Sequence, residues 1–326
     1  MPVSRRTIVQ MALASIPVIG LSACSSGSSS SSSGSATGGE SGTISVGFSQ
    51  VGAESGWRTA NTQSIKDNLT DAKGFKLTFV DAQQKQENQI KALRDFIDQG
   101  MDVIAFSPVI QTGWDQVLGE IKDAKIPLVL TDRAVTTSVT DPYQGFIGSD
   151  FKHEGVLAGN WVKQNAADAK IFELQGTMGS APQVDRQSGF DSIMGSQIIG
   201  RASGNFTRAE GKTAMEAALQ SYPSMNLVFS HNDDMALGAL EAISAAGKTA
   251  GTDIKIVSCD AVKDGLQALH DKKFNFVVEC NPLFGDQLAD LIKKVHGGQS
   301  STTQTVVNET TFDQTITQAT IDARKY

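Results

Sequence analysis

Charged and amide side chains recur directly after short apolar segments of this sequence. The residues in question are Gln50, Glu54 and Arg58, Asp81 and Gln83, and Asp132 and Arg133, then Gln175, Arg186, Asn205, His231 to Asp234, Asp260 and Glu279. A sugar hydroxyl can donate to a carboxylate while it accepts from an arginine or an amide, and such charge-assisted hydrogen bonds are about twice as strong as neutral ones. Trp57 and Phe206 add aromatic faces that could cover the C–H surface of a sugar ring. The pattern therefore indicates a carbohydrate site.

The elements that must position these side chains alternate in type. Short apolar segments predict strands at 44–48, 77–80, 103–106, 127–131, 170–174, 227–230, 254–258 and 274–278, with a further short strand leading to Phe206. Amphipathic segments predict helices at 57–72, 114–124, 153–165, 184–198, 208–221, 233–246 and 262–270, and one around 90–97 that ends at Gly100. This alternation predicts an α/β fold with two doubly wound parallel-sheet lobes. Ligands of such sheets bind outside the carboxyl ends of the strands.

Length, composition and charge limit the class of protein. The chain has 326 residues, of which 40% are hydrophobic and 19% charged, as expected for a globular protein of about two domains. With 28 basic and 35 acidic residues the net charge is −7, and no basic cluster is present. Nucleic acid is therefore not expected as a partner.

The first 42 residues differ from the rest. Arg5 and Arg6 precede an apolar segment from Ile8 to Leu21, which is typical of an export signal and too short to span a membrane. Ser4-Arg5-Arg6 also resembles a twin-arginine signal, so the export route stays open between that pathway and general secretion. Leu21-Ser22-Ala23-Cys24 resembles a bacterial lipobox, which implies a signal peptide at 1–23 and a lipid on Cys24. The Ser/Gly-rich segment 24–42 is predicted to be a flexible tether.

Several motifs resemble those of one known family. They are GFSQVGAESGWR (47–58), DAQQKQENQIKALRDFIDQGMDVIAFSPV (81–109), LTDR (130–133), NFTR (205–208) and HNDDMALGAL (231–240). Together they are similar to the ribose-type (type I) periplasmic sugar-binding proteins of bacterial ABC importers, and most of all to the galactofuranose-binding members. The likeness covers residues 44 to about 295.

The resemblance implies a clamp with a three-strand hinge. Its N-terminal lobe would comprise 43–147 and 281–307, and its C-terminal lobe 148–280 and 308–326. The expected ligand-binding residues are Glu54, Ser55, Gly56, Trp57, Arg58, Asp132, Arg133, Arg186, Phe206, Asn232, Asp260 and Glu279. The sequence departs from the family pattern at Ala261, where a Gly usually follows the Asp, and at Cys280.

The implied function is capture of a monosaccharide, galactofuranose or a related pentose or hexose, for delivery to an ABC permease. We expect a monomer without cofactor or metal, outside the cytoplasm and attached to the cell membrane only through its lipid. A sugar-sensing receptor without transport is an alternative. A repressor of the same fold is excluded, because a signal and a tether stand where its DNA-binding helices would be.

Some of these residues have possible roles other than binding. Glu54 and Asp260 could be the acid and base of a glycoside hydrolase, but each has a neighbouring Arg or Asn suited to hydroxyls, and no G-x-S-x-G motif is present. His231 has no second His at ligand spacing and is predicted to be structural. Asp233 is predicted to cap the following helix while Asn232 faces the cleft. Cys259 and Cys280 are either bridged or two free buried thiols.

Overall fold

The structure is a computed structural model that describes residues 42–326. The predicted signal peptide, Cys24 and the tether up to residue 41 lie outside the described residues. Within the described residues, no helix is both long enough and apolar enough to cross a membrane.

The N-terminal lobe is built on a six-stranded sheet of order β11-β5-β4-β3-β1-β2. Its elements are β1 (Ile44–Gln50), α1 (Gly56–Asn68), β2 (Phe75–Asp81), α2 (Gln86–Asp98), β3 (Val103–Phe106), α3 (Asp115–Asp123), β4 (Leu128–Thr131), β5 (Gly145–Gly148), α9 (Gly285–His296) and β11 (Thr305–Val306). All five strand pairs are parallel. Connections through helices are what parallel strands require.

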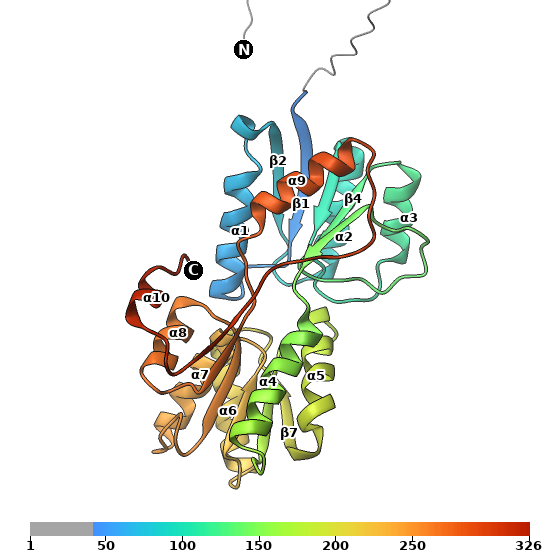
Figure 1. The fold of residues 1–326 in the computed structure, drawn as a ribbon. Coiled ribbons are helices and arrows are strands. Elements are labelled where there is room, and N and C mark those ends of the chain that lie inside the picture. The colour runs from blue at the N-terminus through green and yellow to red at the C-terminus, as the bar shows by residue number, and fades with distance from the viewer. Residues whose placement is uncertain (1–41) are drawn as a thin grey trace, which may run out of the picture. The chain divides into compact units, whose positions relative to one another are not determined.

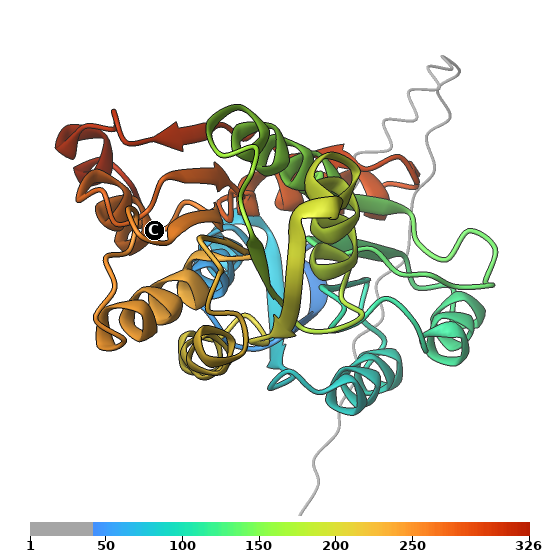
Figure 2. The same ribbon diagram turned by 90° about the horizontal axis from the view of Figure 1, so that it is seen from below.

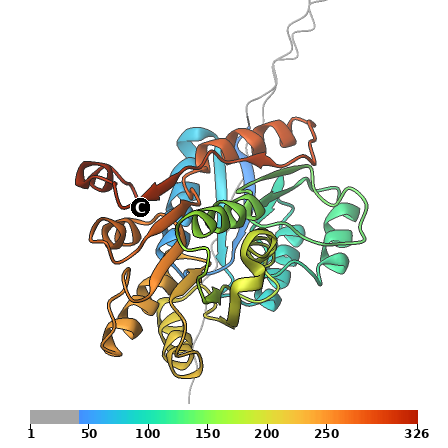
Figure 3. The same cartoon turned by 60° about the horizontal axis from the view of Figure 1, so that its bottom comes forward.

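The C-terminal lobe repeats this plan with the order β12-β10-β9-β8-β6-β7. Its elements are α4 (Phe151–Asn165), β6 (Ile171–Gln175), α5 (Ala181–Met194), β7 (Ile198–Ser203), α6 (Arg208–Ser221), β8 (Leu227–Ser230), α7 (Asp233–Ala245), β9 (Lys255–Asp260), α8 (Lys263–His270), β10 (Phe276–Glu279), β12 (Thr311–Asp313) and α10 (Gln318–Asp322). Only β12 is antiparallel to its neighbour. Helix α10 lies beside α8 at the edge of this lobe (Figures 1 and 3).

Helices cover both faces of each sheet. Successive residues of a strand point to opposite faces and therefore pack against different helices. In the N-terminal lobe, Phe48 packs with α1 and α9, whereas Phe106 packs with α2 and α3. In the C-terminal lobe, Phe229 packs with α4 and α5, whereas Val228 packs with α6, α7 and α8. Figure 2 shows α4 beside α5 and α6 beside α7. The predicted doubly wound α/β fold is confirmed.

Three chain segments connect the two lobes (Figure 1). They follow β5, β10 and β11. They are bonded to one another, since Gln304 Nε2 donates to Ser149 O at 2.9 Å and Asn281 N donates to Glu309 Oε1 at 3.0 Å. Ser149 Oγ also donates to Glu309 Oε1. The predicted three-strand hinge is present.

Candidate functional site

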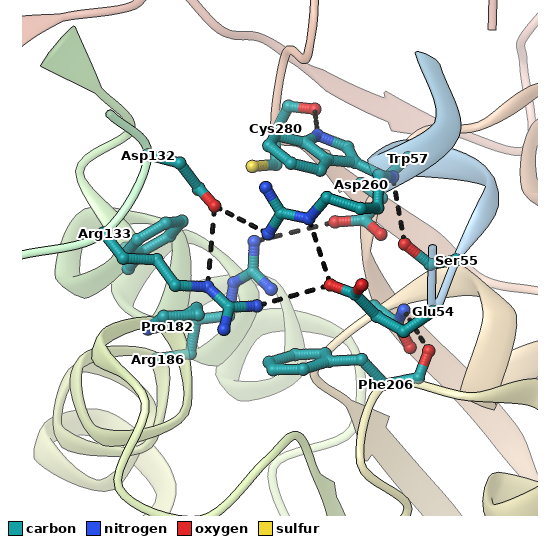
Figure 4. Close-up of a pocket in the computed structure, with 13 residues that line it drawn as sticks. Glu54, Ser55, Trp57, Asp132, Arg133, Pro182, Arg186, Phe206, Asp260 and Cys280 are labelled. Carbon is teal, nitrogen blue, oxygen red and sulfur yellow. Dashed lines mark hydrogen bonds and ion pairs between the residues drawn. The ribbon is translucent and has the colours of Figure 1, made fainter. Parts of the chain in front are cut away.

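A cavity of about 290 Å³ lies between the lobes, at the carboxyl ends of the strands (Figure 4). The side chains that line it are Glu54, Ser55, Trp57, Arg58, Asp132, Arg133, Phe151, Pro182, Arg186, Phe206, Asn232, Asp260 and Cys280. Ten of the twelve residues expected to bind ligand are among them.

Arg58 organises the wall contributed by the N-terminal lobe. Its Nε lies 3.0 Å from Glu54 Oε1 and its Nη2 lies 2.7 Å from Asp132 Oδ2. Ser55 places it there by capping α1, where its side chain accepts from Arg58 N at 3.1 Å. Burial by itself would lower the pKa of Arg58, but the charges of Asp132 and Glu54 outweigh it and raise that pKa. Arg58 is thus a fixed cation.

Arg133 is buried but less fully paired. Its Nε lies 3.5 Å from Asp132 Oδ2 and its Nη2 lies 3.6 Å from Glu54 Oε1, and only Nη1 donates a hydrogen bond, to Val109 O at 3.2 Å. Burial, followed by the nearby charge of Arg58, lowers the pKa of Arg133 to about 10. Among the described residues, neither Arg133 Nε nor Glu54 Oε2 has a hydrogen-bond partner. One donor and one acceptor of cavity-lining residues are therefore left unpaired by the protein.

Arg186, on α5, organises the opposite wall. Its Nε donates to Glu154 Oε2 at 2.6 Å, and its Nη2 lies 3.6 Å from Asp260 Oδ1. Burial by itself would lower the pKa of Arg186, but Glu154 in particular raises it. Burial raises the pKa of Asp260. Each lobe therefore contributes arginine and carboxyl groups to one small cavity.

Aromatic rings complete the walls. Trp57 Nε1 donates to Cys280 O at 2.6 Å, which ties the first helix to the hinge. The Phe206 ring packs against Gly176, where a Cβ atom would overlap it. Asp132, Phe206 and Asp260 have φ angles of 62°, 64° and 111°. Such strained backbone is costly for residues other than Gly and concentrates at functional sites.

The prediction for Asn232 and Asp233 is wrong in part. Asn232 is the N-cap of α7, and its Oδ1 accepts from Met235 N at 3.0 Å while its Nδ2 donates to Phe206 O at 3.1 Å. It lines the cavity as well. Asp233 is buried inside the lobe, where its Oδ2 accepts from Val262 N at 2.8 Å, and burial raises its pKa to about 7.

Two predicted ligand-binding residues do not line the cavity. Glu279 points toward the C-terminal segment, where its carboxylate accepts from Tyr326 Oη at 3.0 Å and pairs with Arg324 Nη2 at 2.7 Å. The next residue, Cys280, lines the cavity instead, because consecutive strand residues face opposite sides. Gly56 bonds through its backbone to Asp234 in the other lobe.

Three cavity residues were missed. Phe151 and Pro182 belong to the first turns of α4 and α5, and the Phe151 ring lies 5.0 Å from the Arg186 guanidinium carbon. Phe151 follows β5, a strand that the apolar pattern did not predict, and Pro182 lies well beyond the end of β6. The third, Cys280, directly follows Glu279, the residue that the family resemblance indicates.

Cys259 and Cys280 are free buried thiols. Cys259 is paired in the sheet with Val278, so Cys280 lies two residues, about 7 Å, further along the neighbouring strand. That offset exceeds the reach of a disulfide. His231 is structural, as predicted, since it is fully buried with its Nε2 2.9 Å from Glu173 Oε1.

One group in the described part of the chain has the spacing of metal ligands. Atoms of Glu154, Cys280 and Glu309 lie within 4.8 Å of one another. Arg186 pairs with Glu154, and Ser149 and Asn281 bond to Glu309. Because these partners already use the carboxylates, the group is better suited to hydrogen bonding within the hinge than to holding a cation.

The fold and the cavity define a two-lobed solute-binding protein. Comparison with known families matches residues 46–300 to the periplasmic binding protein domain. The chain belongs to this family. Its relatives in the family are substrate-binding proteins, so the chain is a binding protein and not an enzyme.

Named relatives are similar over most of the chain. The galactofuranose-binding protein YtfQ of Escherichia coli (strain K12) is 42% identical over 260 residues, which are 77% of this chain and 81% of that one. A protein from Mycobacterium smegmatis, solved in complex with β-D-fucofuranose, is 53% identical with a TM-score of 0.81 and coverage of 86% and 93%. The arabinose-transporter binding protein of Shewanella sp. ANA-3, bound to α- and β-L-arabinofuranose, is 41% identical with a TM-score of 0.82 and coverage of 86% and 96%.

Proposed function

We propose that this protein captures a monosaccharide in its furanose form by closing its two lobes, and delivers it to an ABC importer. The observation that carries the proposal is the cavity in which Arg58, Arg133 and Arg186 alternate with Glu54, Asp132 and Asp260. A ligand that bridges both lobes favours the closed state, because only that state makes both sets of contacts.

The composition of the cavity supports a polyol as ligand. Three guanidinium groups and three carboxyl groups line it, so hydrogen-bond donors and acceptors for hydroxyl groups are present together. The protein leaves the donor Arg133 Nε and the acceptor Glu54 Oε2 without hydrogen-bond partners, and a sugar hydroxyl can pair with either kind of group. The Phe206 ring lies 5.4 Å from the Arg133 guanidinium carbon and would cover one C–H face.

The relatives support the furanose form. Galactofuranose, fucofuranose and arabinofuranose appear in the names of the three similar proteins. A five-membered ring is the feature common to those sugars. We infer the same ring form for this ligand.

The proposal includes a lipid anchor outside the cytoplasm. Leu21-Ser22-Ala23-Cys24 and the Ser/Gly segment that follows support acylation of Cys24. The variant Cys24→Ala should leave the membrane fraction and bind sugar as tightly as the wild type. Wild-type protein recovered from the medium with residues N-terminal to Cys24 still attached would contradict this part of the proposal.

A thermal-shift screen of the exported protein against monosaccharides tests the binding proposal. A ligand stabilises the folded state by mass action, so saturation at 100 times its Kd should add about 2.7 kcal/mol to the free energy of unfolding. Amino acids and nucleotides should leave the melting temperature unchanged. Release of reducing sugar from an oligosaccharide would support the hydrolase instead.

A further inference from the structure

One hydrogen bond joins the two lobes at the rim of the cavity. The backbone N–H of Gly56, in the N-terminal lobe, donates to Asp234 Oδ2 in the C-terminal lobe at 2.8 Å. Neither residue lines the cavity. The bond therefore connects the lobes without occupying the place of a ligand.

The bond satisfies a group that its own lobe leaves free. Helix α1 begins at Gly56, and the first N–H groups of a helix have no partner within the helix. Ser55 accepts from Arg58 N, but the Gly56 N–H is served only from the other lobe. Asp234 lies in the first turn of α7, so its carboxylate lies near the positive ends of two helices.

The bond lies directly beside residues that line the ligand site. Ser55 and Trp57, on either side of Gly56, both line the cavity, and so does Asn232, two residues before Asp234. A second link between the lobes, from Gln111 N to Gly179 O at 2.9 Å, uses backbone atoms only. Substitution of Asp234 can therefore change the stability of the closed state without changing a residue of the cavity wall.

We propose that Asp234 is a positioning residue for ligand binding, which holds the lobes closed by accepting from the Gly56 N–H and so sets how long a bound sugar is retained. The inference rests on the proposed function. Opening the lobes separates Gly56 from Asp234 and exposes both groups to water. The bond therefore contributes to the closed state alone.

The test compares Asp234→Asn and Asp234→Ala with the control Asp264→Ala. Asp264 is an exposed acid in the first turn of α8, in the same lobe, so its loss also removes a charge at a helix end. Its charge repels that of Asp234, so its loss can strengthen the bond to Gly56 but cannot break it. Stopped-flow Trp fluorescence should show that Asp234→Ala releases the screened sugar about three- to tenfold faster than wild type, as expected for the loss of one ordinary hydrogen bond. Asp234→Asn keeps an acceptor oxygen, so its release rate should lie between those of wild type and Asp234→Ala. The association rate and the ligand-free melting temperature should match those of Asp264→Ala.

Equal release rates for Asp234→Ala and Asp264→Ala would overturn the proposal. If wild-type protein binds no sugar in the screen, the proposed function fails, and closure is then measured directly. Small-angle X-ray scattering of the ligand-free proteins should give a larger radius of gyration for Asp234→Ala than for wild type and Asp264→Ala. Equal radii in that case would also overturn the proposal that Asp234 holds the lobes closed.

Discussion

Arg133 and Phe206 face each other from opposite lobes, with the guanidinium carbon 5.4 Å from the centre of the ring. Arg133 is held by one hydrogen bond within its own lobe and by two long ion pairs, 3.5 Å to Asp132 and 3.6 Å to Glu54. Its charge is thus kept in the cavity without full compensation. Burial of this guanidinium therefore costs free energy in the ligand-free protein.

Arg133→Ala should lower sugar affinity at least about tenfold, because the ligand loses a hydrogen bond to a charged group, worth about 1.5–3 kcal/mol. The ligand-free melting temperature should not fall, because burial and, second, the charge of Arg58 disfavour the guanidinium that is removed. Titration calorimetry and scanning calorimetry measure the two quantities. Arg94→Ala, which breaks a half-exposed pair with Glu120, is the control and should bind normally. Wild-type affinity in Arg133→Ala would mean that the ligand does not contact this wall.

Gly176→Ala should weaken both the fold and ligand binding, because its Cβ would overlap the Phe206 ring and displace this part of the wall. Gly119→Ala, on α3 with no atom within 4 Å of the added Cβ, should be neutral or slightly stabilising. Adding Phe206→Leu to Gly176→Ala should recover melting temperature but not affinity. Thermal melts with and without sugar separate the two effects, and an unchanged melt for Gly176→Ala would contradict the packing described.

Asn232→Ala should lower both stability and affinity. Loss of the α7 cap costs about 0.5–2 kcal/mol, and loss of the amide frees Phe206 O, which Asn232 Nδ2 bonds. Asn232→Ser can still cap the helix and should recover stability while affinity stays low. Urea unfolding measures the stability of the two variants, and calorimetry measures their affinity for the sugar. If both variants bound sugar normally, Asn232 would have only the capping role.

Glu309→Gln should change how stability depends on pH. Burial raises the pKa of Glu309 from 4.5 to about 9, so the folded state holds a proton that the unfolded chain releases above pH 4.5. Stability from this group is therefore complete below about pH 4.5 and is lost as the pH rises toward 9. At pH 8 the variant should melt at least roughly 2 °C above wild type, with no such gain at pH 4.5. Glu216→Gln, at an exposed position, is the control, and parallel pH profiles for Glu309→Gln and wild type would refute the prediction.

Much of the fold and site could be predicted because parallel sheets place their strand ends together. That rule located Glu54, Arg58, Asp132, Arg133 and Asp260 without any contact information. It failed at Glu279, since a shift of one residue along a strand exchanges the two faces. A pattern cannot resolve such a shift at the end of a strand.

Other features depend on geometry that residue types do not specify. Asn232 and Asp233 are both good helix caps, and only the extended φ of −154° at Asn232 identifies the N-cap. Helix α9 carries the apolar spacing Leu288, Ile292 and Val295, a signal that the sequence analysis did not use. Strand β11 has two residues and no periodicity, and it forms only because β5 offers it an edge.

Titration calorimetry of the exported protein with L-arabinose, D-fucose, D-galactose and D-ribose tests the central claim most directly. A clamp with charged groups on both lobes should bind at least one of these sugars with a Kd in the micromolar range or below, which corresponds to about −8 kcal/mol or better. The same sugar should lose affinity in Arg133→Ala. Absence of binding heat for all four sugars at millimolar concentration would contradict the account.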